Sequence, residues 1–130
     1  MERSSYPDST RIQDEHRILA EHIGRIQKAI YATPQEDGII LSELRELVVV
    51  AREHFRREET IMQRQSYSDF LLHKRDHEYL LRNVIEFIAS FVDGRAPASA
   101  SVAEGFQSWL DFHIKKYDAP FLEFMTTRQA

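Results

Sequence analysis

Two short stretches decide the fold: HFRREETIM at residues 54–62 and HKRDH at residues 73–77. Each contains two potential metal-ligating side chains four residues apart, His54 with Glu58 and His73 with His77. Residues four apart on a helix differ by only about 40° around its axis, so both members of a pair point the same way. Each stretch therefore predicts a helix that directs two polar side chains at one target.

Apolar residues around these stretches recur in alternating steps of three and four, which is typical of amphipathic helices. Glycine, proline and small polar residues interrupt the pattern at 33–38, 65–68 and 93–97. The pattern predicts an all-α protein, an antiparallel up-down-up-down four-helix bundle with a short C-terminal helix. The predicted helix starts are Asp8 or Ser9, a position near Ile39, Ser68, and Ser101. Ser101 with Glu104 forms a capping-box pattern, and Gly94 suits the position after the third helix.

Seven polar residues interrupt this apolar seam or lie beside it. Counted outward from the three turns, all seven fall within roughly two helical turns of one level in the bundle. They belong to four groups, one per helix: His16; His54 and Glu58; His73 and His77; His113 and Asp118.

One pair in this set does not fit a regular helix. His113 and Asp118 are five residues apart, which places them about 140° from each other on an α-helix. Pro120 lacks an amide donor for the Lys116 carbonyl, so we expect the helix to break or loosen there. Asp118 could then cap a final helix from Ala119 to about Thr126 while its carboxylate turns inward.

The chemistry of this set indicates a site for two metal ions. Buried imidazoles and carboxylates are costly unless they are paired or bound to a metal. Imidazole with carboxylate suits iron, manganese or zinc rather than calcium or magnesium. Two carboxylates are enough to bridge two ions, and five nitrogens then divide three and two. With one bridging oxygen added, one metal has six ligands and the other has five. The two metal ions therefore differ, and one of them has an open coordination position.

Composition limits the other functions. The chain has 130 residues, a net charge of −4 and no cysteine, which excludes disulfides and thiolate-ligated metals and gives no reason to expect nucleic acid. Its apolar runs are too short to insert into a membrane, and residues 1–17 form no secretory signal. We expect a single domain over 1–130 with an N-terminal arm at 1–8, cytoplasmic and monomeric.

The complete pattern resembles the hemerythrin family in its single-domain bacterial form. The resemblance covers roughly residues 10–125 and rests on the two stretches above, on Tyr67, and on WLDFHI at 109–114 followed by Asp118, Pro120 and Phe121. The sequence departs from the family pattern at Gly24 and Ser68, and before the first helix only Tyr6 could supply an arm aromatic. None of these departures removes a ligand.

The resemblance implies a non-haem di-iron centre, with an oxo or hydroxo bridge and no haem, that binds dioxygen reversibly. One iron would be held by His73, His77 and His113, the other by His16 and His54, and Glu58 and Asp118 would bridge them. Dioxygen would bind at the five-coordinate iron of His16 and His54. An apolar O2 pocket would be formed by Phe55, Trp109, Leu110 and Ile114.

Three functions stay open at this point. The first is an O2 carrier, store or delivery protein without catalytic residues. The second is an O2 or redox sensor acting through a separate protein partner, and the third is a di-iron enzyme handling peroxide or NO. We expect His22 to be a solvent-facing bystander and Glu59 to be a surface charge, because both leave the seam. The charged run at 56–59 is interpreted as a mostly solvated helix face.

Overall fold

The computed structural model describes residues 8–128, and every regular element within this range is helical. The elements are α1 (Asp8–Tyr31), α2 (Asp37–Arg64), α3 (Phe70–Val92), α4 (Ala100–His113), the π-helix η1 (Ile114–Asp118) and α5 (Ala119–Arg128). The predicted all-α bundle with a short C-terminal helix is confirmed. The expected N-terminal arm, including Tyr6, lies outside the described residues except for Asp8, which begins α1.

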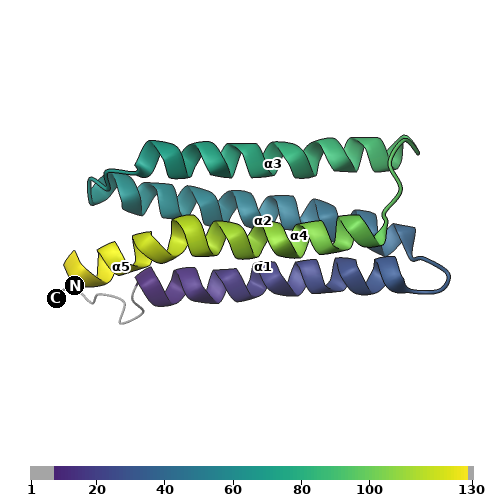
Figure 1. The fold of residues 1–130 in the computed structure, drawn as a ribbon, viewed down its shortest axis with the longest axis horizontal. Helices are drawn as coiled ribbons and strands as arrows, with labels where there is room; N and C mark the ends of the chain where they lie inside the picture. Colours follow the sequence, from purple (N-terminus) through teal and green to yellow (C-terminus); the bar gives the residue numbers. More distant parts are fainter. Residues whose placement is uncertain (1–7, 129–130) are drawn as a thin grey trace, which may run out of the picture.

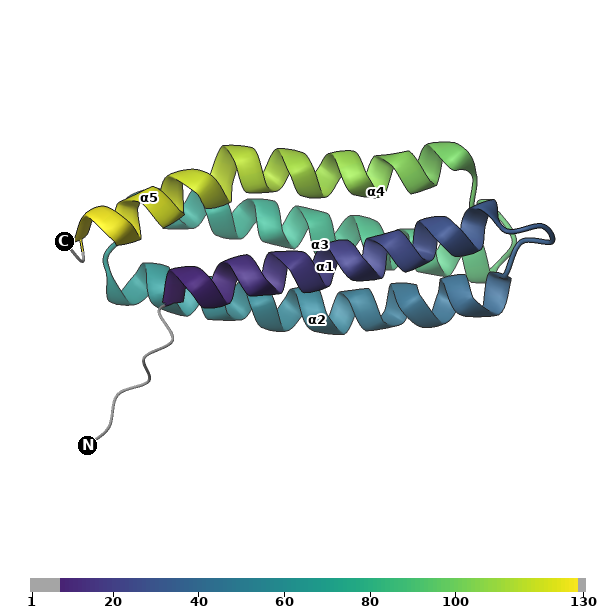
Figure 2. The same ribbon diagram turned by 90° about the horizontal axis from the view of Figure 1, so that it is seen from below.

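The four long helices run antiparallel along one common axis (Figures 1 and 2). Helix α1 packs against α2 and α4, and α2 packs against α3. Helix α5 continues from α4 through η1 and packs against α1 at the end where α1 begins. No helix within residues 8–128 is long and apolar enough to cross a membrane.

Several helix ends differ from the predicted ones. Helix α2 starts at Asp37 and α3 at Phe70, each two residues from its predicted start. Helix α4 is capped by Ser99, whose side chain accepts a hydrogen bond from the Val102 amide, so the Ser101 cap was wrong. Ser99 has the extended backbone of an N-cap residue, whereas Ser101 already lies in the first helical turn. Gly94 is confirmed after α3, with a φ of +75° that favours glycine.

The apolar core consists of two separate groups. The large cluster fills the bundle toward the α1–α2 connection and contains, among others, Ile23, Leu44, Ala51, Leu80 and Leu110. The small cluster lies toward α5 and contains Ile12, Ile61, Met62, Phe121 and Met125. Along every helix the predicted polar set falls between these two clusters, so it lies within the core rather than on the surface.

Candidate metal centre

The structure brings all seven predicted residues together at one level of the bundle. Six of them are buried, with 0–2% of their surface exposed, and the His16 side chain is 11% exposed. They come from α1, α2, α3, the end of α4 and η1. The helical spacing that the sequence indicated therefore produces one cluster.

Asp118 contacts histidines from three different helices. Its Oδ1 lies 2.7 Å from His73 Nε2 and 3.1 Å from His113 Nε2. Its Oδ2 lies 2.8 Å from His16 Nε2. The two oxygens of one carboxylate thus face different groups of imidazoles.

Glu58 divides the same histidines in the same way. Its Oε1 lies 3.1 Å from His77 Nε2 and 3.8 Å from His73 Nε2. Its Oε2 lies 3.4 Å from His54 Nε2 and 3.8 Å from His16 Nε2. Both carboxylates therefore present one oxygen to a three-histidine half, His73, His77 and His113, and the other to a two-histidine half, His16 and His54.

The spacing of the ligand atoms matches this division. One set of atoms lying within 4.8 Å of one another comes from the three-histidine half, and a second comes from the two-histidine half. Glu58 and Asp118 belong to both sets. The arrangement can hold two cations side by side with two shared carboxylates.

A π-turn, rather than a helix break, aligns Asp118 with His113. Within η1 the backbone bonding pattern widens, and the Ala119 amide donates to the Ile114 carbonyl five residues earlier. One extra residue in the turn brings residues five apart onto one face. The predicted capping role of Asp118 was wrong, because its side chain is buried against the histidines and the helix continues through Pro120.

Three further carboxylates hold the outer nitrogens of the histidines. His54 Nδ1 donates to Glu15 at 2.7 Å, His77 Nδ1 to Glu59 at 2.8 Å and His113 Nδ1 to Asp76 at 2.6 Å. These bonds fix the tautomer that leaves Nε2 without a proton when a metal binds. The expectation that Glu59 is only a surface charge was wrong.

Sequence reasoning missed Glu15 and Asp76 altogether. Each of the three outer carboxylates follows or precedes a predicted ligand by one residue, so it borders the seam: Glu15 beside His16, Glu59 beside Glu58, Asp76 beside His77. A carboxylate next to a predicted ligand can therefore be recognised in the sequence as a candidate partner of a histidine. This adjacency does not tell which histidine on a neighbouring helix the carboxylate will reach, because this depends on how the helices pack.

Charges inside the metal-free cluster shift the protonation of its members. Burial opposes the imidazolium form of His54, but the charge of Glu58 and hydrogen bonding to Glu15 and Glu58 outweigh it and raise the pKa to about 10. Burial likewise opposes charge on His113, yet hydrogen bonds to Asp118 and Asp76 raise its pKa to about 9. Burial would raise the pKa of Glu58 and of Asp118, and the surrounding histidines hold both below their usual values.

Many polar atoms of the cluster make no well-formed hydrogen bond within residues 8–128, although most lie within ion-pair distance of one another. Such buried atoms destabilise a fold unless something else satisfies them. Imidazole nitrogens and carboxylate oxygens gathered around one centre suit transition-metal cations, so the residues fit a metal centre. The atoms are His16 Nε2, His54 Nε2, Glu58 Oε1 and Oε2, His73 Nδ1, His77 Nε2, His113 Nε2 and Asp118 Oδ2.

Comparison with known proteins agrees with this geometry. The family model of the hemerythrin HHE cation binding domain matches residues 8–124. This chain belongs to the hemerythrin family. It is 30% identical over 106 residues to the bacteriohemerythrin of Methylococcus capsulatus, covering 81% of this chain and 79% of that protein.

Two other relatives are also similar to this chain. The bacteriohemerythrin of Pseudomonas aeruginosa is 30% identical over 113 residues, which is 86% of this chain and 71% of that protein. The myohemerythrin of Sipunculus nudus is 34% identical over 83 residues, 64% of this chain and 63% of that protein. No solved structure matches this chain.

The four residues expected to form an apolar pocket in this hemerythrin-like chain lie on the large-cluster side of the centre. The Phe55 ring stacks on that of His77, with ring centroids 3.9 Å apart and planes inclined by 8°. Phe55 and Leu110 are buried in the large cluster. Trp109 and Ile114 are partly buried and pack against it.

His22 does not behave as the sequence led us to expect. It is buried rather than solvent-facing, and its Nδ1 lies 2.8 Å from Glu43 Oε1 on α2. Arg25 also contacts Glu43, at 3.1 Å. His22 is buried by tertiary packing. Helix α2 covers the side of α1 that lies beside the apolar seam, where the sequence pattern alone predicted exposure to solvent. His22 is absent from both ligand sets and ties α1 to α2.

Proposed function

We propose that this protein binds dioxygen reversibly at a non-haem di-iron centre, as a carrier, store or delivery protein. His73, His77 and His113 would hold one iron, His16 and His54 the other, and Glu58 and Asp118 would bridge the two. A single observation carries the proposal: each of two buried carboxylates faces histidines of the three-histidine half with one oxygen and of the two-histidine half with the other. When bound, the iron pair would supply the electrons for reversible binding of O2.

The unequal number of histidines supports binding rather than mere metal storage. A half with one imidazole fewer leaves a coordination position for an exogenous ligand, and it contains His16, the most exposed member of the cluster. In the three-histidine half every imidazole is at most 2% exposed. The small ligand would therefore enter on the side of His16 and His54.

The protein's own contribution is to hold the imidazoles and exclude water. Glu15, Glu59 and Asp76 orient three rings through their Nδ1 atoms. Phe55, Trp109, Leu110 and Ile114 would form an apolar wall that keeps out the water and anions that promote oxidation. An apolar hollow of about 250 Å³ lies between α3 and α4; its residues nearest in sequence to His77 and His113 are Leu80 and Trp109, and it extends away from the centre to Phe87 and Val102. Such surroundings favour a small apolar gas over a charged ligand.

The test is anaerobic loading with Fe(II), iron counting, and visible spectra through repeated cycles of O2 addition and removal. We expect two irons per chain and an absorption band that appears with O2 and disappears on its removal over several cycles. A band that forms once and persists would favour a redox sensor acting through a partner. Sustained consumption of peroxide or NO would favour the enzyme. A chain that retains no iron would refute the proposal.

A further inference from the structure

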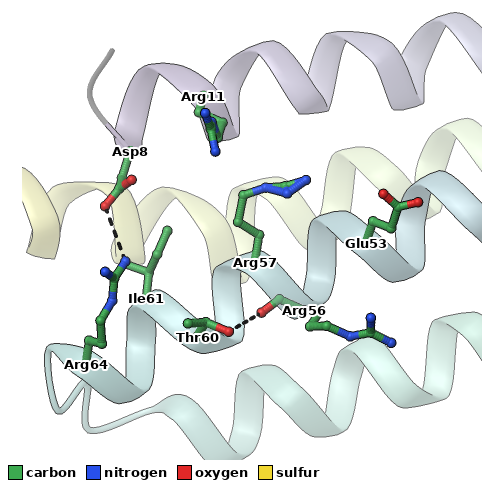
Figure 3. Close-up of a pocket in the computed structure, with 8 residues that line it drawn as sticks. All are labelled: Asp8, Arg11, Glu53, Arg56, Arg57, Thr60, Ile61 and Arg64. Atoms are coloured by element: carbon green, nitrogen blue, oxygen red, sulfur yellow. Dashed lines mark hydrogen bonds and ion pairs between the residues drawn. The ribbon is translucent and has the colours of Figure 1, made fainter. Parts of the chain in front are cut away.

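A second polar feature lies outside the metal centre, in a groove between the start of α1 and the second half of α2 (Figure 3). The groove encloses about 360 Å³. Four arginines line it against only two acidic residues, on a chain whose net charge is negative. The lining consists of Asp8, Arg11, Glu53, Arg56, Arg57, Thr60, Ile61 and Arg64.

Three of these arginines, Arg56, Arg57 and Arg64, are only partly neutralised by the protein. Arg57 Nε donates to Glu15 at 2.9 Å, and Arg64 lies 3.9 Å from Asp8 in an exposed pair that contributes little to stability. The Arg56 guanidinium has no ion-pair partner within the part of the chain that the structure describes. Figure 3 shows Arg11 from α1 and Arg57 from α2 extending into the space between the helices, while Arg64 points at Asp8.

We propose that this groove binds a small phosphate-bearing anion, either inorganic or the phosphate end of a nucleotide. Guanidinium groups bind phosphate oxygens through paired, charge-assisted hydrogen bonds, and several around one hollow favour an anion with more than one charge. The Thr60 hydroxyl donates to the Arg56 carbonyl at 2.9 Å, so the guanidinium groups supply the donors, and Ile61 supplies an apolar surface. The volume of about 360 Å³ falls within the range of small-molecule sites.

The choice of variants follows from the contacts. Arg57 is unsuitable, because its loss would also release Glu15, which holds the ring of His54. Arg56 and Arg64 line the groove, are exposed, and do not contact the centre. Arg45 on α2 and Arg82 on α3 are exposed outside the groove, so Arg45→Ala/Arg82→Ala changes the net charge equally and is the matched control.

The experiment is calorimetric titration of the iron-loaded protein with inorganic pyrophosphate and, separately, with ADP at fixed ionic strength. We expect one site per chain for wild type and for the control Arg45→Ala/Arg82→Ala. In the Arg56→Ala/Arg64→Ala double variant we expect affinity at least about tenfold lower, because two charged donors are lost. Equal affinities for the two probes would mean that the phosphates alone are recognised, and tighter ADP binding would mean that the nucleoside also contacts the groove.

Three results would overturn the proposal. The first is the absence of saturable binding to wild type. The second is heat that persists unchanged in the double variant, which would locate the anion elsewhere, including on the iron. The third is saturable binding of poly-glutamate without binding of pyrophosphate, which would assign the groove to an acidic protein segment. Iron loading itself is measured separately, so failure of the di-iron proposal would not be mistaken for failure of this one.

Discussion

The two halves of the metal centre share both carboxylates but differ in how they are enclosed. In the three-histidine half every ring is at most 2% exposed, and Glu59 and Asp76 hold two of the three rings from outside. In the two-histidine half Glu15 holds His54, whereas His16 comes alone from α1 and is 11% exposed. The half with one histidine fewer is therefore also the more exposed half, as a protein that binds an external ligand requires.

The largest effect should come from Glu58, because both halves share it. Glu58→Gln keeps the size of the side chain but removes the charge that lets both oxygens bind cations. We expect loss of both irons, measured as iron per chain after anaerobic loading and desalting. Glu53→Gln, an exposed residue on the same helix, is the control and should keep two. Two irons in Glu58→Gln would show that the halves do not depend on a shared carboxylate.

A histidine from a single half should separate the two halves. His77→Ala is expected to remove the iron of the three-histidine half, and His54→Ala that of the two-histidine half, each leaving about one iron per chain. Iron content together with circular dichroism would distinguish this from unfolding. If either variant retains both irons, that histidine is not a ligand and the division into halves fails.

Metal uptake should depend on pH in both halves, because each contains a histidine with a raised pKa. The pKa values of about 10 for His54 and about 9 for His113 mean that both carry a proton at pH 7.5 in the metal-free protein. Each metal must displace at least one proton, and the pKa of His16 in the two-histidine half is raised as well. Apparent affinity should therefore fall at least about tenfold per pH unit below pH 9 in each half. A pH indicator should record about two or more protons released per chain on Fe(II) binding. Uptake independent of pH between 6.5 and 8.5 would contradict these protonation states.

The raised pKa values of His54 and His113 also predict how the stability of the metal-free protein depends on pH. A folded pKa above the unfolded value of about 6.5 means that these histidines stabilise the fold at and below neutral pH. This contribution is lost as pH rises through about 9 and 10. Metal-free protein should unfold at a lower temperature at pH 10 than at pH 7. The iron-loaded protein should not show this difference.

The outer carboxylates should have a smaller effect on affinity. Asp76→Asn and Glu15→Gln keep the shape but weaken the hold on His113 and His54, so metal affinity should fall about 10- to 100-fold. Competition with a chelator would measure it. Glu78→Gln, beside His77 but exposed, is the control and should change nothing. Affinities equal to that of wild type would reduce Asp76 and Glu15 to surface charges.

The smallest effect is expected from the apolar wall. Leu110→Ala should leave two irons per chain but speed the oxidation of the O2-loaded protein several-fold, since it opens a cavity on the large-cluster side of the centre. The rate is followed by decay of the O2-dependent absorption band. Leu122→Ala, partly buried at the small cluster, is the control. Equal rates in the two variants would remove Leu110 from the wall.

Much of this architecture could be predicted because polar residues in an apolar seam are informative. The steps of three and four fixed the helix faces, and the seven predicted ligands lie together as their spacing required. The loosening of the helix near Pro120 was predicted and is confirmed, but its form was not: the bond from Ala119 to Ile114 makes a π-turn, and Asp118 lies within it against histidines on other helices. The contacts of Glu15 and His22 were missed for a related reason. Both lie beside the seam, where helix packing rather than periodicity decides what is buried.

The most direct test of the central claim is anomalous diffraction at the iron edge from crystals of the Fe(II)-loaded protein. Two peaks are predicted, one beside His73, His77 and His113 and one beside His16 and His54, with Glu58 and Asp118 contacting both. A single peak, or two peaks that share neither carboxylate, would contradict the asymmetric two-iron centre.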